Sequence, residues 1–338
     1  MSAAPRSNSH DAYFRHVMGR PADAASELRV VLPKDVAARV DWDGLELQPG
    51  SFVSKHLRSR YSDLIFRTRL DGHDAYIYLL IEHQSRSDPL MPLRMLDYLV
   101  HIWNHYVREH PHTRTLPAVV PLVVHSNHTG RPWNAPTELT ELIDLDPPTR
   151  DALGPYLPRF RFLLDDVAAL DLPALRARDL TPAARVMLAL HKIVPGNTHL
   201  GVELLPLIED LHAILDGPGG TDEFQCVASY ILIVGDTQQA DLQPLIDRLG
   251  PRAKEAIMTT AERLRAEGRA EGRAEGEAKG RVQGEATGRV NALVDLLTSR
   301  FGPIPAAIAD TIHTADPTQV RTWTVRVLTA TALDEVFA

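Results

Sequence analysis

The sequence predicts an α/β fold, with a mixed central sheet in the N-terminal half and an all-helical C-terminal region. Two strand-like runs flank a tight turn at 71–74, and a nearly continuous apolar run at 116–125 is typical of a strand buried on both faces. From residue 180 onward the apolar spacing is helical and is interrupted by Pro-Gly and Gly-Pro pairs. With 338 residues and 44% hydrophobic content, the chain can form more than one globular unit.

The segment before the sheet is expected to be mainly helical. Helices are predicted at 10–18 and 23–32, with Pro21 near the start of the second, and a short third helix at 34–40. Glu27 lies on the second helix, and we expect it at the surface. Short strands are predicted at 45–47 and 52–53, on either side of a Pro-Gly pair.

A β-hairpin at 62–85 is the most informative stretch of the chain. Taking Gly72 and His73 as the two loop residues places Asp63 directly opposite Glu82, because each cross-strand pair then sums to 145. Directly opposed residues share a face, with Cβ atoms about 4.5–5.5 Å apart. Gln84 follows Glu82 by two residues and therefore lies on that face as well.

Two carboxylates so close together remain ionised most readily when a cation lies between them. Their hard oxygen atoms suit Mg²⁺ or Mn²⁺ better than zinc, and a divalent ion held in this way can activate water against a phosphodiester. The alternative is that Asp63 begins one strand, Glu82 ends the other, and both are solvated. A shift of one residue in the pairing would also change their relation.

The rest of the N-terminal half alternates helix, strand and loop. A helix is expected at 90–109, a strand at 116–125, a loop-rich stretch at 127–148 and a last short strand at 160–164. The helix carries His101 and His105, with His110 and His112 just beyond. Histidines four residues apart on a helix can bind zinc, but surface or hydrogen-bonded histidines are the simpler interpretation.

The distribution of charge bears on a nucleic-acid partner more than the net charge of −8 does. Residues 1–130 carry 15 Lys and Arg against 14 Asp and Glu, whereas residues 131–338 carry 21 against 30. Asp63 lies in a stretch of the sequence with an excess of cations. These cations would attract a phosphate backbone. A solvated basic strand is the alternative. The candidate DNA-binding cations are Lys55, Arg58, Arg60 and Arg67.

Composition also indicates the compartment. The single cysteine, Cys226, excludes an intramolecular disulfide and lies in an apolar run where we expect a small core residue. The N-terminal residues lack a signal-peptide hydrophobic region, and no apolar run reaches the roughly 18 residues of a membrane span. We therefore expect a cytoplasmic protein with no membrane partner.

A glycine recurs every fourth residue between 268 and 288, in a tract whose charges nearly cancel. Each glycine costs a helix about 1 kcal/mol relative to alanine, so an isolated helix here would be marginal. A helix that forms a homo-oligomer or serves as a spacer is one interpretation, and a disordered linker is the other. The predicted organisation is a core at 1–195, a helical extension at 196–250, the glycine-periodic segment at 251–289 and a small helical domain at 290–338.

Several separate short motifs of the sequence resemble those of the Rpn family of recombination-promoting nucleases, also described as transposases. The resemblance runs from about residue 9 to about residue 195, and the end of the chain is similar to a helical domain of unknown function. The motifs are His10-Asp11-x-x-Phe14, Pro49-Gly50-Ser51-Phe52-Val53, Ser62-Asp63, Leu80-Ile81-Glu82-His83-Gln84-Ser85, Pro92-Leu93-Arg94-Met95-Leu96, Ile102-Trp103 and the strand at 116–123.

This resemblance implies a PD-(D/E)XK restriction-endonuclease-like core and a Mg²⁺- or Mn²⁺-dependent DNA endonuclease linked to recombination or transposition. It implies Asp63, Glu82 and Gln84 as catalytic residues, with the metal held by Asp63, Glu82 and the backbone carbonyl of His83. Gln84 replaces the usual lysine, as it does in the Rpn pattern itself. Similar enzymes sometimes add a helix carboxylate as a ligand, a second possibility for Glu27.

Two departures from the expected pattern keep a second function open. The strand at 116–125 is followed by His125-Ser126-Asn127 where relatives usually carry Tyr-His-Gly, which leaves the role of this turn in doubt. Gln84 carries no charge, so Lys55 or a nearby arginine could supply the positive charge that the usual lysine provides. The alternative is a catalytically inactive DNA-binding or assembly protein that retains the nuclease fold.

Overall fold

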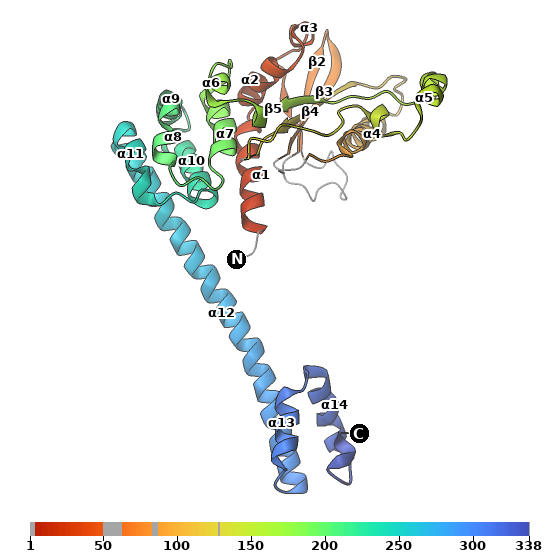
Figure 1. Ribbon diagram of the computed structural model, residues 1–338, viewed down its shortest axis with the longest axis vertical. Helices are drawn as coiled ribbons and strands as arrows, with labels where there is room; N and C mark the ends of the chain where they lie inside the picture. Colours follow the sequence, from red (N-terminus) through yellow and green to blue (C-terminus); the bar gives the residue numbers. More distant parts are fainter. Residues whose placement is uncertain (1–3, 50–62, 83–86, 128, 338) are drawn as a thin grey trace. The chain divides into compact units, whose positions relative to one another are not determined.

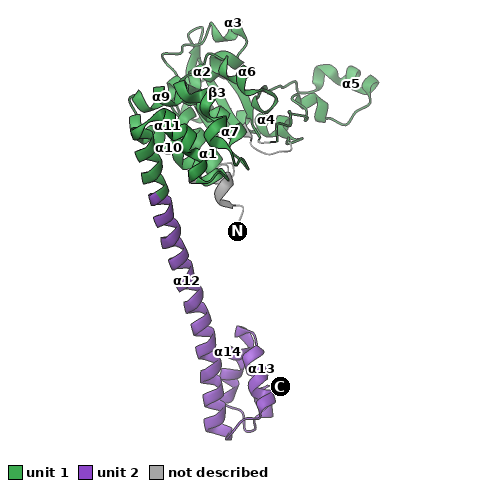
Figure 2. Cartoon of the chain, turned by 60° about the vertical axis from the view of Figure 1, so that its left-hand side comes forward, with its two compact units in different colours: residues 1–261 green, residues 262–338 purple. Residues whose placement is uncertain are grey.

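The computed structural model describes residues 4–49, 63–82, 87–127 and 129–337. The chain divides into two compact units, Met1–Ala261 and Glu262–Ala338, which are coloured separately in Figure 2. The strand predicted at 52–53 lies outside the described residues.

A mixed sheet of five strands, in the order β1-β2-β3-β4-β5, forms the centre of the first unit within the described part of the chain (Figure 1). The first three strands pair antiparallel, whereas β3, β4 and β5 are parallel. This sheet, together with the helical C-terminal part, confirms the predicted fold class. The strands are β1 (Glu46–Leu47), β2 (Leu64–Leu70), β3 (His73–Glu82), β4 (Ala118–His125) and β5 (Leu163–Asp166).

The hairpin between β2 and β3 forms as predicted, but its turn lies one residue earlier. Asp71 and Gly72 are the loop residues, with φ angles of 49° and 82°, and Leu70 pairs with His73. Two successive positive φ values define the type I′ turn, whose backbone twist matches that of the flanking strands. The cross-strand pairs therefore sum to 143, as in Leu64 with Leu79.

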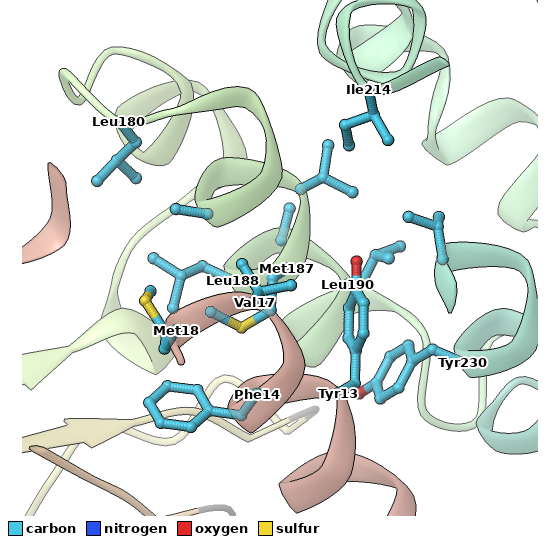
Figure 3. Packing of buried hydrophobic residues seen from close by; sticks show 14 of the residues in the cluster. Tyr13, Phe14, Val17, Met18, Leu180, Met187, Leu188, Leu190, Ile214 and Tyr230 are labelled. Carbon is cyan, nitrogen blue, oxygen red and sulfur yellow. The ribbon is translucent and has the colours of Figure 1, made fainter. Parts of the chain in front are cut away.

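The two faces of the sheet carry different helices. Odd and even positions alternate between the faces, so Phe66 and Leu79 contribute to one core while Ile65 and Tyr78 contribute to the other. The first face packs against α1 (Ala4–Met18), α2 (Pro21–Val31) and α7 (Pro182–Ile193), and Figure 3 shows Phe14 and Met18 beside Met187. The second face packs against α4 (Met91–Glu109).

The helical extension shares the core of the first face. Its apolar residues, including Ile214 and Tyr230 in Figure 3, belong to the same cluster as those of α1 and α7. The extension comprises α8 (Leu200–Glu203), α9 (Ile208–Asp216), α10 (Gly220–Val234) and α11 (Gln243–Leu249). Three further short helices are α3 (Lys34–Ala37), α5 (Pro147–Leu153) and α6 (Leu172–Arg176); α5 begins at the end of the stretch predicted as loop-rich, and no helix was predicted there.

The second unit has a small core of its own, built by the end of α12 (Pro251–Phe301) with α13 (Ala306–Thr314) and α14 (Pro317–Val327). Leu293, Leu297 and Trp323 are buried in it. The glycine-periodic tract lies inside α12 as continuous helix, and a Cβ added at any of its glycines would meet nothing within 4 Å among the described residues. No helix among the described residues is long and apolar enough to cross a membrane.

Candidate functional site

The ends of the parallel strands bring ionisable residues into one row. In the parallel register Glu82 is the partner of His125, and His125 is the partner of Asp166. Paired residues share a face, and Val123, two residues before His125, belongs to the core beneath α4. The carboxyl ends of parallel strands are the usual location of ligand sites in α/β proteins.

Asp63 joins this row from the start of β2. Continuing the β2–β3 register by one residue places Asp63 across from Leu80, on the α4 face. Arg15 of α1 donates from Nη1 to the Asp63 backbone carbonyl at 2.9 Å, and both Asp63 carboxylate oxygens are buried.

The observed register corrects the predicted pairing of the two acids. Asp63 and Glu82 are not directly opposed, because the pairs sum to 143 rather than 145. Because the turn lies one residue earlier than predicted, each residue of β2 pairs with a residue of β3 two positions before the predicted one. The positions of Asp63 and Glu82 therefore still share a face but are diagonal neighbours. Diagonal neighbours are typically about 7–8 Å apart, which is farther than the direct pair that the sequence suggested.

Two buried tyrosines lie close to the Asp63 carboxylate. Burial raises the pKa of Tyr78, and Asp63 raises it further through its charge and a hydrogen bond. Burial and the charge of Asp63 also raise the pKa of Tyr98, which belongs to α4. The two rings pack together with centroids 4.7 Å apart. Asp63 therefore faces α4 in a tyrosine-lined environment.

An arginine of α4 borders the same tyrosines. The positive charge of Arg94 lowers the pKa of the Tyr98 hydroxyl against the larger effect of burial. Its Nη1 donates to Asp88 Oδ2 at 2.6 Å. The other Asp88 oxygen accepts from the Leu90 backbone N–H at 2.9 Å, so one carboxylate binds the backbone just before α4 and orients the guanidinium.

His125 is the centre of a second polar network at the strand ends. The side chain is 1% exposed and its Nδ1 lies 2.7 Å from Asp166 Oδ1, so we assign Nδ1 as the donor. Nε2 then accepts from Asn127 Nδ2 at 3.2 Å. The second Asp166 oxygen accepts from the Trp133 backbone N–H at 2.8 Å. This network anchors the turn after β4, for which the sequence supported no role.

The opposite face carries a buried acid cluster. Glu27, expected at the surface, is instead fully buried. Arg178 donates two hydrogen bonds to Asp165, at 2.8 and 2.6 Å, and its Nη1 is 3.7 Å from Glu27. Burial and the neighbouring Asp165 raise the pKa of Glu27 well above its usual range. Burial opposes ionisation of Asp165, but hydrogen bonds from Arg178 and Glu27 lower its pKa.

The other sequence-predicted residues are placed only in part. Arg67 lies on the α4 face by parity, is exposed, and pairs with Asp74 at 3.3 Å. The side chain of Glu82 lies outside the described residues, as do all of His83, Gln84, Lys55, Arg58 and Arg60.

The histidines of α4 bond to nearby groups on their own helix. His101 Nδ1 lies 2.8 Å from the Asp97 carbonyl oxygen, and His105 Nε2 lies 3.1 Å from a Glu109 carboxylate oxygen. Within the described ranges no group of three or more His, Cys, Asp or Glu is arranged to hold a metal.

Sequence reasoning missed four of the groups that border the site: Tyr78, Tyr98, Arg94 and the His125–Asp166 pair. Three of them carried a local signal. Tyr78 precedes Glu82 by four strand residues and therefore shares its face, and Arg94 and Tyr98 are four residues apart on a helix. The His125–Asp166 pair spans 41 residues and carried none.

Comparison with known proteins identifies a family and several relatives of this chain. Residues 8–216 match the family described as "Putative transposase, YhgA-like". The recombination-promoting nuclease RpnD of Escherichia coli O157:H7 is 30% identical over 262 residues, covering 76% of this chain and 94% of RpnD. RpnA of E. coli K12, named as a nuclease of the same kind, is 30% identical over 276 residues, covering 79% of this chain and 87% of RpnA.

One of the similar proteins is named as inactive. RpnE of E. coli K12, an inactive recombination-promoting nuclease-like protein, is 29% identical over 279 residues, covering 80% of this chain and 86% of RpnE. No solved structure matches the chain. The extent of these matches shows that the chain belongs to the Rpn family of recombination-promoting nucleases.

Proposed function

We propose that the protein is a Mg²⁺-dependent DNA endonuclease that hydrolyses phosphodiester bonds. The observation that supports the proposal is the strand register, in which the positions of Asp63 and Glu82 fall on one face at the same end of the sheet. The named activity of the relatives RpnD and RpnA supports the reaction class. The excess of cations between residues 50 and 70 favours DNA as the substrate.

The donor set fits a hard divalent cation. Asp63 contributes a carboxylate with buried oxygens, and Glu82 and the His83 carbonyl would add further oxygen ligands. When bound, such a cation supplies a Lewis acid that lowers the pKa of a coordinated water. Asp63 and Glu82 would hold and orient it, and the Gln84 amide would orient the attacking water by hydrogen bonds.

The bond changes follow from hydrolysis of a phosphodiester. The water oxygen forms a bond to phosphorus while the bond from phosphorus to one sugar oxygen breaks. The water gives up a proton, and the leaving sugar oxygen takes one, so the products are a phosphate monoester and a hydroxyl. Developing charge on the phosphate needs positive groups nearby.

The test is nicking of supercoiled plasmid DNA with and without Mg²⁺. Asp63→Ala and Glu82→Ala should each lower the rate at least about 100-fold, because each removes a proposed metal ligand. Asp71→Asn removes an exposed carboxylate from the turn of the same hairpin and should leave the rate within about 2-fold. Equal, metal-dependent nicking by wild type and Asp63→Ala would contradict the proposal.

The second candidate function is an inactive DNA-binding or assembly protein. The inactive relative RpnE favours it. It predicts that the folded protein binds duplex DNA but does not nick it at any Mg²⁺ or Mn²⁺ concentration. Metal-dependent nicking that Glu82→Ala abolishes would dismiss it.

A further inference from the structure

The proposed hydrolysis, on which this inference rests, needs a positive side chain, and none of the three proposed catalytic residues provides one. Asp63 and Glu82 are acidic and Gln84 is neutral, whereas the phosphate gains negative charge as it reacts. Catalytic sites of this type therefore need a positive side chain close to the phosphate. The sequence suggested Lys55 or a nearby arginine only from closeness along the chain.

Arg94 is held in one orientation at the start of α4. Its side chain is 21% exposed, so it is largely fixed by the protein while part of it reaches solvent. Asp88 Oδ2 accepts from its Nη1 at 2.6 Å, and Asp88 itself is fixed by the bond from the Leu90 N–H. An arginine oriented in this way loses little conformational entropy when it binds a further anion.

Two tyrosines connect the position of Arg94 on α4 with the strand ends. Arg94 and Tyr98 are four residues apart on α4 and therefore project from one face of the helix. The Tyr98 ring packs on Tyr78, which lies on the same face of the sheet as Asp63. Asp63 at the start of β2 and Arg94 on α4 thus both act on Tyr98, whose ring packs on Tyr78.

We propose that Arg94 contacts the scissile phosphate and supplies the positive charge that Gln84 does not. The guanidinium group suits this role because it presents several N–H donors in a plane that matches phosphate oxygens. Two other arginines in the described part of the chain have different partners. Arg15 donates to the Asp63 carbonyl, and Arg67 pairs with Asp74. In this arrangement Asp88 and Tyr98 are positioning residues.

The competing explanation is that Arg94 only stabilises the start of α4 through Asp88. The two explanations predict different results for Arg94→Lys. A lysine retains the charge but not the planar fork, so it should recover part of the phosphate function. A purely structural role would show itself as a loss of folded protein, without a specific effect on turnover or on binding of DNA.

The experiment compares Arg94→Gln, Arg94→Lys and Asp88→Asn with Arg108→Gln. Arg108 is exposed in the last turn of α4, so its substitution makes the same change of charge on the same helix away from the site. Each variant is first checked for folding by circular dichroism. Plasmid nicking then gives kcat and KM, and fluorescence anisotropy gives duplex DNA affinity against salt concentration without divalent metal.

Arg94→Gln should lower kcat/KM by about 100- to 1000-fold, with most of the loss in kcat, as for the loss of one transition-state donor. Arg94→Lys should recover at least about 10-fold of that loss, and Asp88→Asn should cost about 10-fold. Arg108→Gln should remain within about 2-fold. In the binding assay Arg94→Gln should reduce the slope of log affinity against log salt by about 1, because one phosphate contact is lost.

The outcomes separate this inference from the proposed function. Wild-type nicking with Arg94→Gln within about 3-fold of it would overturn the role of Arg94 and leave the endonuclease intact. If the wild type does not nick, the endonuclease fails, and the salt slope decides whether Arg94 contacts phosphate. A slope that Arg94→Gln leaves unchanged would overturn the inference in that case too.

Discussion

Each face of the sheet buries an aspartate, and the two aspartates have different surroundings. On the face of α1, α2 and α7, Asp165 is 5% exposed and accepts two hydrogen bonds from Arg178, with Glu27 beside it. On the α4 face, Asp63 lies beside two tyrosines at the start of a strand, close to the carboxyl ends of the parallel strands.

The difference separates a structural acid from a functional one. A buried carboxylate that an arginine binds at both oxygens has its charge compensated within the fold, and it stabilises by holding distant segments together. A carboxylate beside tyrosine hydroxyls at a strand end suits an external cation better. The same residue type therefore serves stability on one face and, as we propose, catalysis on the other.

The largest expected effect is on the face of α1, α2 and α7. Arg178→Ala leaves two acids buried without their cation, and we expect it to lower the free energy of unfolding by about 3–5 kcal/mol. Urea denaturation followed by circular dichroism measures this change. Arg176→Ala, at the exposed end of α6, should change it by no more than about 0.5 kcal/mol. If Asp63→Asn destabilised the protein as much as Arg178→Ala, the contrast between the two faces would be lost.

The same face should also respond to acid through His191. This α7 side chain is 1% exposed, and burial lowers its pKa from 6.5 to about 4. Between those pH values the unfolded chain binds a proton that the folded chain does not, so stability is present above pH 6.5 and is lost as pH falls toward 4. From pH 7 to pH 4.5 the loss should be about 2–3 kcal/mol. Wild type and His191→Gln should differ by this amount in urea unfolding, and parallel curves would refute the assignment.

On the α4 face the expected effect is on activity more than on stability. Tyr98→Phe removes the hydroxyl whose pKa the charge of Arg94 lowers. It retains the packing of the Tyr98 ring on Tyr78. We expect nicking to fall about 10-fold, as for the loss of a supporting hydrogen bond, with a change in unfolding free energy below about 1.5 kcal/mol. A loss of stability without a loss of activity would place Tyr98 among the structural residues.

The smallest expected effect is in the turn that both faces share. Gly72 has a φ angle of 82°, and Gly72→Ala should cost about 1 kcal/mol because of backbone strain, since nothing lies within 4 Å of the added Cβ. Gly154→Ala is the matched control: Gly154 has a right-handed helical conformation, so the change should be near zero. Thermal unfolding of the two variants measures the difference, and equal melting temperatures would show that the turn tolerates a side chain.

Much of the fold could be predicted because its signals are local. The hairpin, the α4 helix and the strand at 118–125 each follow from alternation or helical spacing over a few residues. The turn was misplaced because both the Asp71-Gly72 and the Gly72-His73 pair can form two-residue loops. Aspartate adopts a positive φ more readily than most residues, which decides in favour of the first pair.

The candidate site was harder to predict because its supporting groups are distant in sequence. The burial of Glu27 depends on Asp165 of β5 and on Arg178, which follows α6, and both are far from Glu27 in the sequence. His125 depends on Asp166, and Tyr98, four residues from Arg94 on α4, packs on Tyr78 of β3. Helix α5 was missed because it is short and begins with two prolines, which also occur in loops.

The type I′ turn has a consequence for how the family can vary in length. In a two-residue hairpin, two positions on opposite strands lie on the same face only when their residue numbers differ by an odd number. The positions of Asp63 and Glu82 meet this condition. Adding or deleting a single amino acid between them would send one acid to the opposite side unless a bulge absorbed it. Natural homologues that cleave DNA should therefore differ in this interval by even numbers of residues.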